Sequence, residues 1–222
     1  MNYAAILFSL LLPVSGETLH YAISWPSGLS LGEATLNTSH RHDEIDFWES
    51  SLEIDASVPG FAIRDHYHSK ASGQDVCASV LDKTVSRGAR KSQETVSFDQ
   101  DQHRVTRETR GENGRSSFSV PACARDALSF LQFVRNELAG GRLAPQQPVV
   151  LGGAYNVRLE TSGTETVKSL EKAVQADRIQ VTIKGAVSSY TVQILFARDP
   201  ARTPVLIRIP LPLGTFTAEL TR

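Results

Sequence analysis

The sequence contains very little sulfur, with two cysteines and one methionine among 222 residues. Two cysteines are too few for a disulfide-rich small scaffold or for a zinc site with four cysteine ligands. An excess of charge is also missing, because 23 Lys and Arg residues are balanced by 24 Asp and Glu residues. Nucleic-acid-binding proteins usually carry a basic surplus, so this balance argues against that class. The phosphate-binding loop, the dinucleotide fingerprint and the H-E-x-x-H motif are absent as well.

Long hydrophobic runs are also missing, since a membrane-spanning helix needs about 20 apolar residues. The most apolar stretch, Ala4–Leu12, is shorter and contains Ser9. Its length is typical of the core of an export signal, and Val14-Ser15-Gly16 supplies the small residues that precede a cleavage site. We therefore expect residues 1–16 to be a signal peptide, cleaved near Gly16. Residues 17–222 should form a single β-rich domain that is periplasmic or secreted.

Two alternatives concern this N-terminal segment. No Lys or Arg precedes the apolar run, so either Met1 is not the true start or the free amine supplies the usual positive charge. The other alternative is that this segment is not a signal peptide but a buried first strand of the fold. No later run is long enough to cross a bilayer, so we expect no transmembrane segment after cleavage.

Export changes the interpretation of Cys77 and Cys123. In an oxidising compartment, two cysteines are most simply paired in one disulfide bond. The alternative is two separate buried thiols. Their spacing excludes a C-x-x-C redox centre.

Most of the chain shows the alternation of apolar and polar residues that is typical of strands with one buried face. The pattern is clearest near the C-terminus, and Pro, Gly and Asp-Pro separate the segments. The strand-like segments are 19–25, 31–39, 45–57, 61–72, 91–98, 102–110, 179–183, 190–196, 205–209 and 216–220.

One segment has the period of a helix instead. Leu128, Leu131, Val134 and Leu138 recur at steps of three and four residues. Asp126 is a good N-cap, and two glycines follow at 140 and 141. We therefore predict a mainly β (α+β) fold, in which one large curved antiparallel sheet or half-barrel of about a dozen strands packs on a single main helix at about 126–139.

Four parts of the chain resemble the bacterial family known as domain of unknown function 3108, which consists of exported proteins with no established activity. These parts are 21–25 with 31–36, 90–99, 121–135, and 198–205 with 214–216. They extend over nearly all of the mature chain, but Gln132 interrupts a pair of aromatic residues that is usual in the family's helix. The resemblance implies an envelope protein rich in antiparallel β-structure, and it implies no reaction.

Gly28-Leu29-Ser30-Leu31-Gly32 matches the G-x-S-x-G pattern of the hydrolase nucleophile elbow. That elbow joins a strand to a helix, whereas residues 33–38 alternate like a strand. We therefore expect a hairpin turn here and assign no catalytic residue. A serine hydrolase acting through Ser30 is kept as an alternative.

His66 and His68 stand two residues apart on a predicted strand and therefore point to one face. His40 and His42 repeat this spacing. Imidazole binds zinc and copper, so His66 and His68 are candidate metal ligands. No established spacing supplies further ligands, so we interpret both as residues of a solvated face and assign no metal and no cofactor.

Basic residues are frequent between Arg87 and Arg115, where acidic residues are interleaved with them. Such a mixture is typical of charge pairing between neighbouring strands on an exposed face. A patch for anionic lipid headgroups or polysaccharide is the alternative.

Large apolar residues are the remaining indication of function. They could simply fill the core, but a curved sheet over one helix can also enclose an apolar cavity. The candidate lining residues are Trp25, Phe61, Leu128, Phe130, Leu131, Phe133 and Val134. We therefore expect a non-catalytic periplasmic envelope protein that binds or carries a hydrophobic or amphipathic ligand such as lipid. The alternative is a structural or assembly factor of the cell envelope that acts through contacts with a protein partner.

Overall fold

A computed structural model describes residues 15–42, 46–58, 60–111, 114–211 and 214–222. Most of the predicted signal peptide, residues 1–14, therefore lies outside the described residues. In the described ranges, one sheet of fifteen strands packs against one helix, α1 (Ala127–Ala139). The strands are β1 (Ser15–Ser24), β2 (Ser30–His42), β3 (Asp46–Val58), β4 (Phe61–Ser72), β5 (Cys77–Arg87), β6 (Arg90–Asp99), β7 (Arg104–Thr109), β8 (Gly114–Ser119), β9 (Arg125–Asp126), β10 (Gln147–Val150), β11 (Ala154–Ser169), β12 (Lys172–Lys184), β13 (Ser189–Ala197), β14 (Pro204–Leu211) and β15 (Gly214–Leu220).

The prediction of one large, mainly antiparallel sheet with a single helix is confirmed, but the strand number of about a dozen was too low. The alternation did not reveal β5, β8, β10 and β11, nor the two-residue β9. These segments are short or carry polar residues on both faces, so their apolar rows are interrupted. The helix comprises Ala127–Ala139, and Asp126 is its N-cap as predicted.

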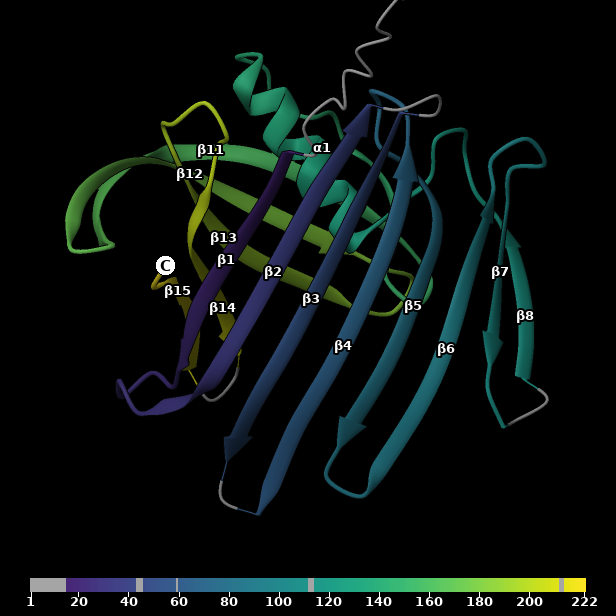
Figure 1. The fold of residues 1–222 in the computed structure, drawn as a ribbon, viewed down its shortest axis with the longest axis horizontal. Helices are drawn as coiled ribbons and strands as arrows, with labels where there is room; N and C mark the ends of the chain where they lie inside the picture. Colours follow the sequence, from purple (N-terminus) through teal and green to yellow (C-terminus); the bar gives the residue numbers. More distant parts are fainter. Residues whose placement is uncertain (1–14, 43–45, 59, 112–113, 212–213) are drawn as a thin grey trace, which may run out of the picture.

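The order of the strands follows the sequence in two runs. Each strand from β8 to β1 pairs with its sequence neighbour, β1 pairs with β15, and the order then runs back from β15 to β9. Every pair is antiparallel except β9 with β10, which are parallel and flank α1 in the sequence. Figure 1 shows how the sheet bends, so that β2–β5 lie in front of the strands β12–β14.

The bend brings one edge of the sheet onto the inner face of other strands. Val150 of β10 and Ala124 before β9 share a buried cluster with Leu81 and Val96 of β5 and β6. The backbone N–H of Ala78 donates to the carbonyl oxygen of Ala124 at 3.0 Å. The edge strand β9 and its neighbour β10 therefore lie against the inner face of β5–β7.

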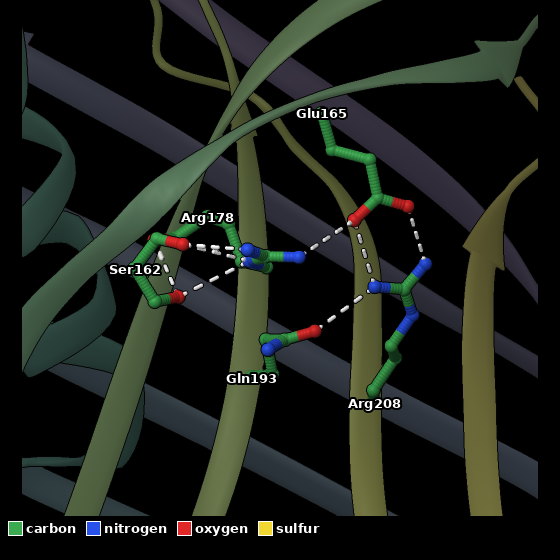
Figure 2. A network of polar contacts seen from close by, with 5 residues as sticks. All are labelled: Ser162, Glu165, Arg178, Gln193 and Arg208. Carbon is green, nitrogen blue, oxygen red and sulfur yellow. Dashed lines mark hydrogen bonds and ion pairs between the residues drawn. The ribbon is translucent and has the colours of Figure 1, made fainter.

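The long β11–β12 hairpin folds back across its own half of the sheet. Its register shifts between Thr161 and Thr164, and Glu165 beyond this point reaches Arg208 on β14, with 2.7 Å between Oε1 and Nη2. Figure 2 shows this ion pair together with Gln193, which accepts from Arg208, and Arg178, which donates to the carbonyl oxygen of Ser162. The Arg208 guanidinium lowers the pKa of the Glu165 carboxyl below its usual value. This polar network holds the β11–β12 hairpin against β13 and β14.

Candidate functional site

A cavity of about 240 Å³ lies between α1 and the strands β10–β14. All of its lining side chains are apolar. They are Leu52 of β3, Ala127, Leu128, Phe130, Leu131 and Val134 of α1, Val149 of β10, Leu151 of the β10–β11 turn, Val157 and Leu159 of β11, Val181 and Ile183 of β12, Val192, Ile194 and Phe196 of β13, and Ile207 of β14. The cavity is partly open to solvent.

Local periodicity explains why these side chains converge. Leu128, Leu131 and Val134 recur at helical steps and share one face of α1. On the facing strands, residues two apart point to the same side of the sheet, as Val157 and Leu159 do on β11. The two surfaces contact each other through Phe130 and Val134, which pack with Ile179 and Phe196. The remaining space is the cavity.

The structure places four of the seven candidate lining residues at this cavity, namely Leu128, Phe130, Leu131 and Val134. Phe133 lies on another side of α1, where the guanidinium of Arg125 stacks 3.7 Å from its ring centroid.

Trp25 and Phe61 lie in two different hairpins. Trp25 follows β1 and packs edge to face with Phe216, with 4.7 Å between ring centroids. Phe61 begins β4 at an exposed hairpin end. Most of the lining comes instead from strand residues that sequence reasoning did not single out. Their signal was the period-two alternation on β12 and β13, which marks a buried face but does not show that the face borders a cavity.

The start of α1 is held to the sheet by a buried carboxylate. Oδ1 of Asp126 accepts hydrogen bonds from the backbone N–H groups of Leu128 and Ser129, and Oδ2 accepts from the hydroxyl of Ser69 on β4 at 2.6 Å. Burial is the strongest influence and raises the pKa of the Asp126 carboxyl, against these hydrogen bonds, which lower it. The carboxylate therefore fixes the end of the helix that borders the cavity.

A disulfide between Cys77 and Cys123 confirms the predicted pairing and lies beside the same helix end. Arg125, which is buried, donates from Nε to the carbonyl oxygen of Asp75 at 3.0 Å. Desolvation lowers the pKa of the Arg125 guanidinium. Gln100 adds two hydrogen bonds with the backbone of Ala124, both of 3.0 Å. The entry into α1 is thus attached covalently to β5, and by hydrogen bonds to the turns that precede β5 and follow β6.

The second half of α1 is attached to β1. Buried Arg135 donates to the carbonyl oxygen of Ala201 at 2.9 Å, and its Nη2 lies 2.7 Å from Oε2 of Glu17. Burial raises the pKa of Tyr21, whose hydroxyl donates to the carbonyl oxygen of Pro204. The contacts of Arg135 thus attach the helix to β1 and to the β13–β14 turn.

Charged side chains lie on the inner face of β4–β7, beside the apolar region. Lys83 Nζ is 2.6 Å from Oε1 of Glu94, and Nε of Arg107 is 2.8 Å from Oε2 of the same residue. Nε of Arg87 donates to Oδ2 of buried Asp65 at 3.0 Å, and this hydrogen bond is the main reason that the pKa of Arg87 is raised. Along β5 and β6, the inner face therefore changes from the buried apolar residues Leu81 and Val96 to the charged residues Lys83 and Glu94.

The candidate metal ligands pair with separate carboxylates. His68 Nε2 lies 2.8 Å from Glu49, and His66 Nδ1 lies 3.5 Å from Glu53. His40 of β2 stacks on Trp48 with 3.8 Å between ring centroids. Within the described part of the chain, no group of three His, Cys, Asp or Glu side chains is arranged to hold a metal ion.

Ser30 is an exposed residue at the beginning of β2, after the turn in which the N–H of Gly28 donates to the carbonyl oxygen of Trp25. The G-x-S-x-G segment thus joins two strands, as predicted, whereas a nucleophile elbow joins a strand to a helix. Among the described residues, no helix is both long and apolar enough to span a bilayer.

Comparison with known proteins identifies one family model, described as "Protein of unknown function (DUF3108)", which matches residues 18–221. No curated protein gives a significant match. A solved structure described as a beta-barrel-like protein of domain of unknown function DUF1849 from Brucella abortus aligns with a TM-score of 0.65, over 94% of this chain and 96% of that chain. The sequence identity is 4%, so the similarity is one of fold.

A second solved structure is the lipoprotein LppX from Mycobacterium tuberculosis. The alignment covers 92% of this chain and 84% of that chain at 14% identity, with a TM-score of 0.30. This score is too low to indicate a common fold, and the functional interpretation therefore depends on the cavity itself.

Proposed function

The chain belongs to the family of proteins of unknown function DUF3108, whose description names no activity, and we propose that it is a non-catalytic binding or carrier protein for a hydrophobic or amphipathic molecule such as a lipid. The apolar part of the ligand occupies the cavity between α1 and β10–β14. The observation that carries this proposal is the lining of the cavity, which contains no polar side chain.

The size of the cavity supports this proposal. An engineered cavity of about 150 Å³ with an aliphatic and aromatic lining stays dry and binds benzene. The present cavity, at about 240 Å³, is larger and equally apolar. An apolar ligand that covers these lining side chains is stabilised by roughly 25 cal/mol for each Å² of apolar surface removed from water.

We expect that filling the cavity from one wall weakens binding. Val192→Phe adds an aromatic ring to a lining position on β13. The affinity for the neutral apolar dye N-phenyl-1-naphthylamine should fall about tenfold, while the free energy of unfolding rises by about 1 kcal/mol because the added ring fills empty space. Fluorescence titration and urea unfolding measure these two effects.

The matched control is Val187→Phe, the same substitution at a fully exposed position in the β12–β13 turn. It should leave the dye affinity unchanged. Native mass spectrometry of the purified protein should also detect a bound lipid, and V192F should retain less of it. Equal dye binding by the native protein, V192F and V187F would show that the cavity is not the binding site.

We also propose that the protein is exported and that residues 17–222 are its mature, single folding unit. The disulfide is compatible with an oxidising compartment. Cleavage after Gly16 would retain Glu17, whose carboxylate pairs with Arg135 on α1. We expect the protein secreted by a bacterial host to begin at Glu17, as measured by N-terminal sequencing and intact mass. A chain that keeps residues 1–16 in the cytoplasm would contradict export.

A further inference from the structure

The inner face of the sheet carries one row of directly paired residues that leads away from the cavity. Leu52 of β3, which lines the cavity, is paired with Tyr67 of β4. Tyr67 is paired with Lys83 of β5, and Lys83 with Glu94 of β6. These strands are neighbours in Figure 1. Because adjacent strands are about 4.8 Å apart, Lys83 is two strand spacings from the cavity wall.

Arg107 connects the same charged group to the cavity from the other side. Its Nε atom lies 2.8 Å from Glu94, and its Nη1 atom donates to the carbonyl oxygen of Gly152 at 2.9 Å. Gly152 follows Leu151, which is a lining residue. Lys83, Glu94 and Arg107 therefore form a charged rim beside the apolar cavity. Tyr67, which lies between Leu52 and Lys83 in the row, packs against two hydrophobic clusters.

Within this rim, the carboxylate is the least accessible group. The side chain of Glu94 is 10% exposed, whereas those of Lys83 and Arg107 are 21% and 39% exposed. In the neighbouring ion pair, the carboxylate is again the less exposed partner, since the side chain of Asp65 is 1% exposed and that of Arg87 is 50% exposed. Together the two groups contain three cationic side chains and two carboxylates, which leaves one net positive charge. The accessible part of the rim is therefore cationic.

We propose that this charged rim binds the anionic headgroup, a carboxylate or a phosphate, of an amphiphile whose hydrocarbon chain lies in the cavity. This inference rests on the proposed function and adds the chemical class of the ligand. Guanidinium and ammonium groups form strong hydrogen bonds with carboxylate and phosphate oxygens. The apolar wall next to them lowers the local dielectric constant and strengthens the attraction.

Probes with the same chain and different headgroups test this proposal. Dodecanoate, dodecyl phosphate, dodecanol and dodecylamine, which is a cation at neutral pH, would each be used to displace N-phenyl-1-naphthylamine from the full chain. Both anions should bind roughly 5- to 10-fold more tightly than dodecanol, and dodecylamine more weakly. The preference should decrease as salt screens the charges. The ratio between the two anions distinguishes a carboxylate ligand from a phosphate ligand.

Variants of the charged rim give effects of opposite sign. Lys83→Gln and Arg107→Gln should weaken the binding of the anions roughly 5-fold, whereas Glu94→Gln should strengthen it, because it removes the competing carboxylate. None should change the affinity for dodecanol. Lys70→Gln is the matched control, since Lys70 is an exposed residue of β4 that pairs with Glu49 on β3 at 3.6 Å. If K83Q or R107Q does not fold, E94Q still gives the sign of the effect.

The outcomes separate the two proposals. If no probe displaces the dye, the cavity does not bind amphiphiles and both proposals fail. Dodecanol and both anions could instead displace the dye with equal affinity, and these affinities could be the same in E94Q. That result would retain the cavity as the binding site and overturn the proposal of an anionic headgroup. Tightest binding of dodecylamine would overturn it as well.

Discussion

Replacing both Cys77 and Cys123 by serine is expected to lower the free energy of unfolding by about 4 kcal/mol. The disulfide joins residues 46 positions apart, and closing a loop of this length removes conformational freedom mainly from the unfolded chain. A loss of this size is a large fraction of the 5–15 kcal/mol that stabilises a typical domain. Urea unfolding of C77S/C123S and of the native protein measures the difference.

The folded structure should survive this change. The start of α1 remains attached through the hydrogen bond from Ala78 to Ala124, the two bonds of Gln100 and the contacts of Arg125 with the Asp75 carbonyl. Dye binding should therefore be retained below the unfolding transition. A reducing agent should reproduce the loss in the native protein and have no effect on C77S/C123S. A change of less than 1 kcal/mol in the double variant would contradict an effect on the unfolded chain.

The second large effect is expected at Asp126. Asp126→Ala should lower the free energy of unfolding by about 3 kcal/mol, of which about 1 kcal/mol is the lost helix cap and the rest is the cost of buried donors without an acceptor. The donors concerned are the hydroxyl of Ser69 and the N–H groups of Leu128 and Ser129. Because α1 forms one wall of the cavity, D126A should also weaken dye binding.

Asp126→Asn is the conservative control. Asparagine is an equally good N-cap, its carbonyl oxygen can accept both backbone hydrogen bonds, and its amide can donate to Ser69, so the loss should stay below about 1 kcal/mol. Equal losses in D126A and D126N would show that the hydrogen bonds to Asp126 contribute little.

The native protein and D126N together test how the free energy of unfolding depends on pH. Burial raises the pKa of Asp126 above the usual value of 3.8, so the folded state binds this proton more tightly than the unfolded state. The resulting stabilisation is complete below the unfolded pKa and is lost as pH rises through the folded pKa. The stability of the native protein relative to D126N should therefore fall between pH 4 and pH 8, as measured by urea unfolding at both values. A constant or rising difference would contradict the raised pKa.

Local signals in the sequence predicted the helix and many of the strands well. The helix was expected at about 126–139 and is found at Ala127–Ala139 with Asp126 as its cap, because the cap and the helical period depend on residues within a few positions of one another. The strand predicted at 61–72 has the bounds of β4. By contrast, β5 and β11 were not predicted. Lys83 interrupts the apolar row of β5, and exposed residues are frequent at the far end of β11.

The candidate site was predictable only where it lies on the helix. Leu128, Leu131 and Val134 share one helical face, and this face borders the cavity. The large size of Trp25 and Phe61 made them candidates as well, but size does not show where a side chain lies relative to distant strands. Lys83, Glu94 and Arg107 were indistinguishable in the sequence from other charges on strands.

The sequence by itself determined that this protein is mainly β-structure with one capped helix and a disulfide, because alternation, capping and cysteine pairing are properties of short segments and of residue type. The tertiary structure alone decided the pairing of β1 with β15, the bend that places α1 beside β10–β14, and the juxtaposition of an apolar cavity with cationic side chains. These features depend on which residues meet across long sequence separations. That choice is made by the packing of whole strands and the register between them, and no local pattern records it.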